Sequence, residues 1–140
     1  MKFSFETETL VDIDKIWNMY SDVNNWFKWE SDLEDISLSG QFVQGTKGTM
    51  KLKGQPEMSF ELVKVEKNSE FTDLTVIPHV GEISFIHQLI SKDDKIVVKH
   101  SVEFVPDNRL ETFEDSRFVG KIFKDVPNSV FGLVKAANEL

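Results

Sequence analysis

The first residues of the chain alternate between apolar and polar side chains. Phe3 and Phe5 fall on one side of an extended backbone, and Glu6 and Glu8 fall on the other. Successive side chains of a β-strand point to opposite faces, so this period of two predicts a strand over residues 2–10 with one face toward water.

Two short helices are expected next. Asp12 and Asp22 each precede apolar residues at helical spacing, and aspartate is a favoured residue at the capping position of a helix N-terminus. The apolar residues of the first helix are Ile13, Ile16, Trp17 and Tyr20. Those of the second are Val23, Trp26, Phe27 and Trp29. We expect both helices to carry these side chains into the core.

The middle of the chain has the pattern of six strands separated by turn signals. These signals include Gly45-Thr46, Asn68-Ser69 and Asp93-Asp94. Strands joined by such short turns pair antiparallel. The expected strands cover residues 33–43, 47–53, 57–66, 70–77, 81–91 and 95–105.

The last segment changes to a helical period, with apolar residues that step by three and four. They are Val119, Ile122, Val126, Val130, Leu133, Ala137 and Leu140. The helix is expected to begin near Thr112, because Glu114 and Asp115 then lie in the first turn, where negative charge is favourable. Pro127 lies inside this pattern. A proline there removes the hydrogen bond to the Phe123 carbonyl and should kink the helix.

These elements predict an α+β domain that spans residues 1–140. A sheet with one apolar face needs a cover, and the C-terminal helix is long enough to supply it. We therefore expect a seven-stranded curved antiparallel sheet wrapped around a long C-terminal helix, with two short helices between strands 1 and 2.

The charge balance and the lack of cysteine exclude several classes of partner and of chemistry. The chain has 24 acidic and 16 basic residues and a net charge of −8, so its surface repels nucleic-acid phosphates and anionic lipid headgroups. With no cysteine, disulfides, thiolate metal sites and a cysteine nucleophile are excluded. No apolar run has the form of a signal peptide or a membrane span, and we expect a soluble cytoplasmic domain without membrane insertion.

The tryptophan pattern of residues 16–29 resembles that of a known superfamily. Trp17, Asp22, Trp26 and Trp29 have the spacing found in the START-like superfamily, which has the helix-grip or birch-pollen-allergen fold. The glycine turn and the last strand of that superfamily also have counterparts, at residues 42–48 and 99–104. Within it, the chain is most similar to the polyketide cyclase/dehydrase and lipid-transport group.

This resemblance implies a cavity between the sheet and the C-terminal helix. The cavity is expected to hold a small hydrophobic molecule, such as a lipid, an isoprenoid or a polyketide-like compound. Carriers, cyclases, chaperone activators and ligand sensors all share the fold, so the resemblance fixes no activity. The chain has no catalytic motif of the superfamily, and no cofactor is expected.

A histidine pair is the best-defined polar feature. A two-residue turn at Asp93-Asp94 places His87 directly opposite His100, on the apolar faces of two neighbouring strands. Side chains so opposed lie about 4.5–5.5 Å apart at Cβ. The pair has three interpretations: core histidines with buried partners, a polar anchor for a ligand, or part of a metal site. The third is disfavoured, because only Asp73 offers a nearby carboxylate and zinc needs more protein ligands.

The candidate pocket consists of aromatic, apolar and imidazole side chains that are expected to point inward. They are Trp17, Trp26, Trp29, Phe42, Met50, Met58, Phe60, Phe85, His87, His100, Phe123 and Val130. The alternative for each of them is ordinary core packing.

Three hypotheses of function follow. The first is binding or transport of a small hydrophobic molecule. The second is an enzyme of polyketide cyclase or dehydratase type, in which His87 or His100 acts as general acid or base. The third is a module that binds a partner protein through an exposed apolar patch.

Overall fold

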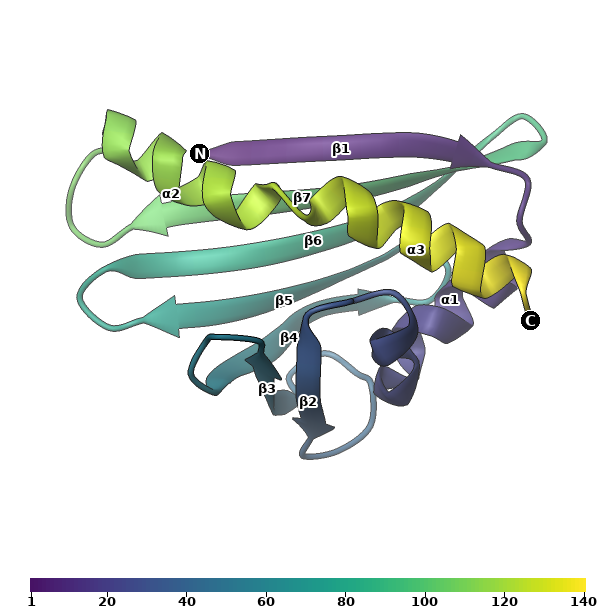
Figure 1. Cartoon of the computed structure of the whole chain (residues 1–140), viewed down its shortest axis with the longest axis horizontal. Coiled ribbons are helices and arrows are strands. Elements are labelled where there is room, and N and C mark those ends of the chain that lie inside the picture. The colour runs from purple at the N-terminus through teal and green to yellow at the C-terminus, as the bar shows by residue number, and fades with distance from the viewer.

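The computed structural model describes residues 1–140, and its main element is one antiparallel sheet (Figure 1). The seven strands lie in the order β1-β7-β6-β5-β4-β3-β2. Every strand pairs with its neighbour in sequence except β1, which joins the far edge by pairing with β7. The strands are β1 (Lys2–Thr9), β2 (Leu33–Leu38), β3 (Lys47–Leu52), β4 (Met58–Glu66), β5 (Glu70–Ile77), β6 (Gly81–Lys92) and β7 (Lys95–Pro106).

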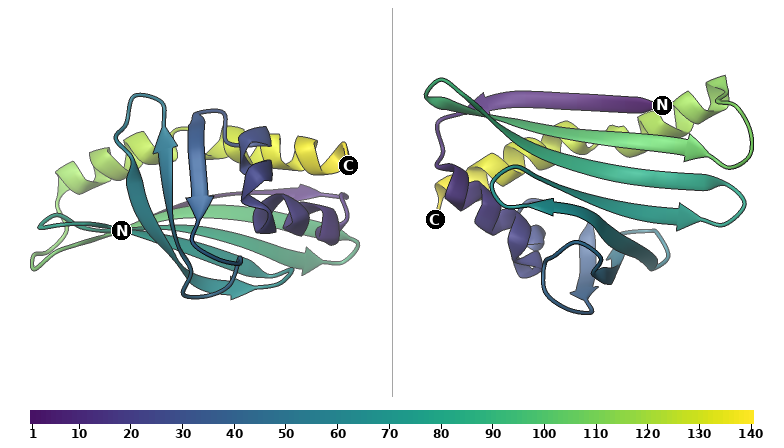
Figure 2. Two further views of the ribbon diagram at one scale, coloured as in Figure 1. Left: turned by 90° about the horizontal axis from the view of Figure 1, so that it is seen from below. Right: turned by 180° about the vertical axis from the view of Figure 1, so that it is seen from behind.

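Helices cover one face of this sheet. They are α1 (Ile13–Ser21), the 3-10 helix η1 (Val23–Lys28), α2 (Phe113–Phe123) and α3 (Val126–Asn138). Figure 2 shows α2 and α3 crossing the face of the curved sheet, with α1 and η1 at one end. Asp12 and Asp22 cap α1 and η1 as expected, because their side chains accept hydrogen bonds from backbone amides. The predicted α+β class and helix-grip architecture are confirmed.

The first predicted strand of the middle segment is too long. β2 ends at Leu38 instead of residue 43, and residues 39–45 form bends and turns. Hydrogen bonds within the connection hold this loop, since the Ser39 amide donates to the Lys47 carbonyl at 2.9 Å and the Thr46 amide donates to the Val43 carbonyl at 3.2 Å. Phe42 therefore reaches the core from a loop.

The C-terminal helix is broken where a kink was expected. α2 ends at Phe123, and α3 begins at Val126 with Pro127 in its first turn. A proline is tolerated in the first turn of a helix, because the backbone amide it lacks has no partner there. The break therefore costs less stability than a proline in mid-helix would. It divides the helical cover of the sheet into two segments, α2 and α3.

The core is divided into two hydrophobic clusters. The larger one joins α1, η1 and α3 to the sheet, and the smaller one consists of Ile83, Val102, Phe104 and Val119 beneath α2. Val126, at the start of α3, packs against both clusters. The break in the helical cover therefore lies over the boundary between them.

Gly48 of β3 allows close packing of the sheet, and we expect Gly48→Ala to lower the free energy of unfolding by about 1–3 kcal/mol. A Cβ atom at this position would lie 2.5 Å from the Ser37 carbonyl oxygen and 2.6 Å from the Phe60 ring. Gly40→Ala is the matched control, since its Cβ would come no closer than 3.9 Å to Thr46. Urea denaturation of the two variants tests this, and equal midpoints would contradict the close approach.

Candidate functional site

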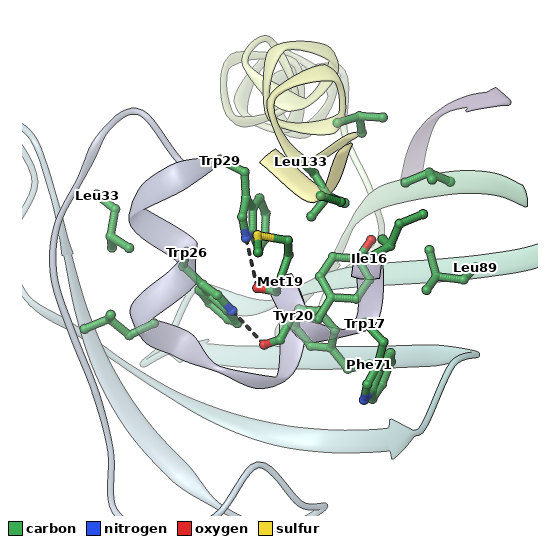
Figure 3. Packing of buried hydrophobic residues seen from close by; sticks show 14 of the residues in the cluster. Ile16, Trp17, Met19, Tyr20, Trp26, Trp29, Leu33, Phe71, Leu89 and Leu133 are labelled. Atoms are coloured by element: carbon green, nitrogen blue, oxygen red, sulfur yellow. Dashed lines mark hydrogen bonds between the residues drawn. The ribbon is translucent and has the colours of Figure 1, made fainter. Parts of the chain in front are cut away.

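Aromatic rings fill the end of the interior that α1 and η1 close (Figure 3). The Tyr20 ring lies 4.8 Å from Phe71 and 5.8 Å from Trp29, measured between centroids. The indole Nε1 of Trp26 donates to the Tyr20 carbonyl at 2.8 Å, and that of Trp29 donates to the Met19 carbonyl at 3.1 Å. The polar atoms of both indoles are thus satisfied by backbone, and their rings act as packing surface.

The two histidines lie opposite one another, as the turn predicted. His87 pairs with His100 in the ladder of β6 and β7, and the ring centroids are 4.7 Å apart. Phe71 stacks on His87 at 3.9 Å with an interplanar angle of 6°. His87 Nδ1 donates to the Phe71 carbonyl at 3.2 Å, and His100 Nε2 lies 2.7 Å from the Tyr20 hydroxyl. Both rings therefore have protein partners.

Burial keeps the imidazoles and the phenol uncharged. It lowers the pKa of His87 to about 3, an effect that hydrogen bonds to the backbone at Phe71 and Phe85 partly offset. Burial and the neighbouring His87 lower the pKa of His100 well below its usual value. The pKa of Tyr20 is raised well above its usual value by burial, so the hydroxyl keeps its proton. At pH 7 all three groups are therefore neutral.

The other candidate residues from the sequence divide between the two clusters. Those buried in the larger cluster are Trp17, Trp26, Trp29, Met50, Phe60 and Val130, with Phe42 packed against it. Phe85 and Phe123 pack against the smaller cluster. Met58 is half-buried and pairs with Met50 across β3 and β4. The candidates thus do not converge on one point, and the boundary between the clusters separates Phe85 and Phe123 from the tryptophans.

Two polar side chains at that boundary lack partners. Asp73 is only 2% exposed and Thr75 only 6%, and neither Asp73 Oδ1 nor Thr75 Oγ1 has a hydrogen-bond partner. Both belong to the inward face of β5, because Asp73 pairs with Phe85 and Thr75 pairs with Ile83 in the ladder. The alternation of Phe71, Asp73 and Thr75 could have indicated this from the sequence.

A second buried carboxyl comes from the helical side. Glu30 follows η1, and burial raises its pKa to about 7, with Asp32 and Asp125 adding to the rise and the Ser129 hydroxyl partly offsetting it. Burial also raises the pKa of Asp73 to about 8, and the negative charge of Glu30 contributes. Neither carboxyl takes part in an ion pair. The interior therefore contains two acids that change protonation near neutral pH.

Two surface hollows have walls that include none of Asp73, Thr75 and Glu30. One, of about 510 Å³, lies over β2 to β5 and is lined by Phe60, Leu74 and Val76 among others. The other, of about 520 Å³, lies between the end of β1 and α3 and is lined by Leu10 and Phe131 among others. No group of three or more His, Asp or Glu side chains is placed to hold a metal ion. None of the helices is long and apolar enough to span a bilayer.

Comparison with solved structures shows the same fold across the whole chain. Ara h 8.0201 superposes with a TM-score of 0.76 at 11% identity, over 100% of this chain and 99% of that one. Protein MLL2253 from Mesorhizobium loti gives 0.78 at 11% identity, over 99% and 98%. Norcoclaurine synthase from Thalictrum flavum, in complex with dopamine and hydroxybenzaldehyde, gives 0.72 at 15% identity, over 99% and 87%.

The chain therefore has the helix-grip fold of these structures. Sequence comparison adds nothing more specific, since no family model and no curated protein matches the chain.

Proposed function

We propose that the protein binds a small hydrophobic molecule between the sheet and the α2–α3 cover, in the cytoplasm as the sequence suggests. The observation that carries this proposal is the pair of partnerless side chains, Asp73 and Thr75, in an apolar interior. Buried polar atoms in proteins almost always have partners, so these two atoms are available to bind a further group. Apolar pockets with a few orienting polar groups are typical of small-molecule sites.

The proposed site lies beneath the break in the C-terminal helix. Along β5, Phe71 belongs to the larger cluster, whereas Thr75 pairs with Ile83 of the smaller one. Asp73 lies between them on the same face. Val126 packs against both clusters from above. A ligand at this boundary would lie between two apolar walls and contact polar atoms on one side only.

The candidate residues from the sequence keep distinct roles in this proposal. Phe85 and Phe123 line the boundary, with Trp29 on the opposite side. At the closed end of the proposed site, the neutral rings of His87 and His100 orient the ligand. The remaining candidates, Trp17, Trp26, Phe42, Met50, Met58, Phe60 and Val130, shape the surrounding core. The ligand class is a lipid, an isoprenoid or a polyketide-like compound, as the resemblance implies.

A bulky residue at the boundary should block binding. We expect Thr75→Phe to weaken the binding of a neutral hydrophobic fluorophore, N-phenyl-1-naphthylamine, by at least about tenfold, which corresponds to about 1.4 kcal/mol. Val76→Phe is the matched control, because the adjacent Val76 side chain points outward and is 59% exposed. Fluorescence titration gives the affinities, and thermal unfolding shows that the variants are folded. Equal weakening by both variants would contradict a site at Thr75.

A second candidate function is acid–base catalysis by the buried carboxyls. A general acid or base works best when its pKa lies near the working pH, which fits Asp73 and Glu30 better than the histidines with their lowered pKa. An enzyme of cyclase or dehydratase type would then lose its turnover in Asp73→Asn while still binding substrate. Turnover that depends on His100 and not on Asp73 would contradict this assignment.

A further inference from the structure

Asp73 and Glu30 are buried carboxyls without a basic partner, and this limits the chemistry of any ligand that lies between them. Resting on the proposed binding function, we infer that the ligand carries a cationic nitrogen, such as an ammonium group, held between Asp73 and Glu30. Its apolar body would occupy the boundary between the two hydrophobic clusters. Within the proposed class of hydrophobic ligands, the inferred ligand is thus an amine.

The two carboxyls belong to opposite layers of the fold. Asp73 projects inward from β5, and Glu30 follows η1 on the helical side, where Ser129 of α3 lies close to it. Asp73 Oδ1 and Thr75 Oγ1 both lack partners, and their residues are two positions apart on one strand, about 7 Å along the backbone. Glu30 as a residue is half-buried, whereas Asp73 is only 2% exposed.

The charged groups around the site are all acidic. Asp32 and Asp125 act on Glu30, and Glu30 acts on Asp73, whereas no lysine or arginine contributes to either carboxyl. His87 and His100 stay neutral, because burial lowers the pKa of both. Since isolated buried carboxylates are costly, these two carboxyls bind protons when the site is empty.

A cationic nitrogen satisfies both the charge and the hydrogen bonds. One ammonium and one proton neutralise two carboxylates, and an ammonium has up to three N–H donors for the partnerless oxygens of Asp73 and Thr75. A carboxylate ligand would bring a negative charge that no group of the site compensates. A neutral alcohol has one donor, which cannot serve the partnerless oxygens of both Asp73 and Thr75. The net charge of −8 also attracts cations over longer distances.

Ligands that share a body and differ in their polar group test this inference by isothermal titration calorimetry. We use octylamine, octanol and octanoate, and a planar set of 1-naphthylmethylamine, 1-naphthylmethanol and 1-naphthoate. Each amine should bind at least about tenfold more tightly than its alcohol, as expected for a charge-assisted hydrogen bond, and each carboxylate most weakly. The preference for amines should increase between pH 6 and pH 8, because both carboxyls ionise in that range.

Two variants test whether Asp73 and Glu30 cause the preference for amines, and a third variant serves as the control. Asp73→Asn and Glu30→Gln should each reduce amine affinity by about tenfold and leave alcohol affinity unchanged. Glu82→Gln removes a charge from the outer face of β6, where the side chain is exposed, and should change neither affinity. If alcohols bind as tightly as amines, the inference is overturned while the binding function remains. If no compound of either set binds, both are contradicted.

Discussion

Replacing Tyr20 with alanine is expected to lower the free energy of unfolding by about 3–5 kcal/mol, the usual cost of removing a large buried aromatic side chain. Tyr20 is fully buried and packs against five rings from α1, η1 and three strands. Its loss would leave a cavity where the helical end meets the sheet, and stiff neighbouring rings cannot collapse into that space. Chemical denaturation measures the change.

Tyr20→Phe separates the packing of the ring from its hydrogen bond. The ring stays, but His100 Nε2 loses its partner at 2.7 Å, and an unsatisfied buried polar group costs about 1–3 kcal/mol. Phe27→Ala is the control for an aromatic side chain in the same region, because Phe27 is 45% exposed. A loss of stability in Tyr20→Ala no greater than in Phe27→Ala would contradict the central position of Tyr20.

Asp73→Asn is expected to stabilise the unliganded protein at pH 7 and to flatten the dependence of its stability on pH. The folded-state pKa of Asp73 is about 8 and the usual value is 3.8. Between these two values the folded protein keeps a proton that the unfolded chain releases, so stability decreases as pH rises, by up to about 1.4 kcal/mol for each pH unit. Below this window the penalty disappears. Asparagine cannot ionise, so the variant avoids the penalty.

Urea denaturation at pH 5, 6, 7 and 8 tests this expectation. The wild-type midpoint should fall across the series, and the difference between Asp73→Asn and wild type should grow by a few kcal/mol, with Glu30 adding to the residual slope of the variant in the same direction. Glu82→Gln again serves as the surface control. Wild-type stability that rises with pH, or a variant that matches wild type at every pH, would contradict the buried state of Asp73.

Much of the fold could be predicted because its signals are local. The period of two in each strand, the helical period of the last segment and the turn at Asp93-Asp94 fixed the element order and the opposition of His87 and His100. The exceptions are also local. The bends that begin at Ser39 end β2 early, and Pro127 lies in the first turn of α3 because a proline is tolerated there.

The site could be predicted only in part, because its partners come from distant elements. The inward position of Asp73 follows from strand alternation, but its lack of a hydrogen-bond partner depends on everything packed against β5. Glu30 lies in a stretch rich in acidic residues, and only tertiary packing buries its carboxyl. The contact of His100 with Tyr20 likewise joins residues 80 positions apart.

Native mass spectrometry of the protein purified gently from its source cells tests the binding claim most directly. We expect a complex heavier than the 16.1 kDa polypeptide by the mass of one small molecule, which denaturation releases and an organic solvent extracts. A bare polypeptide mass, unchanged after exposure to a panel of lipids, polyketides and hydrophobic amines, would contradict it.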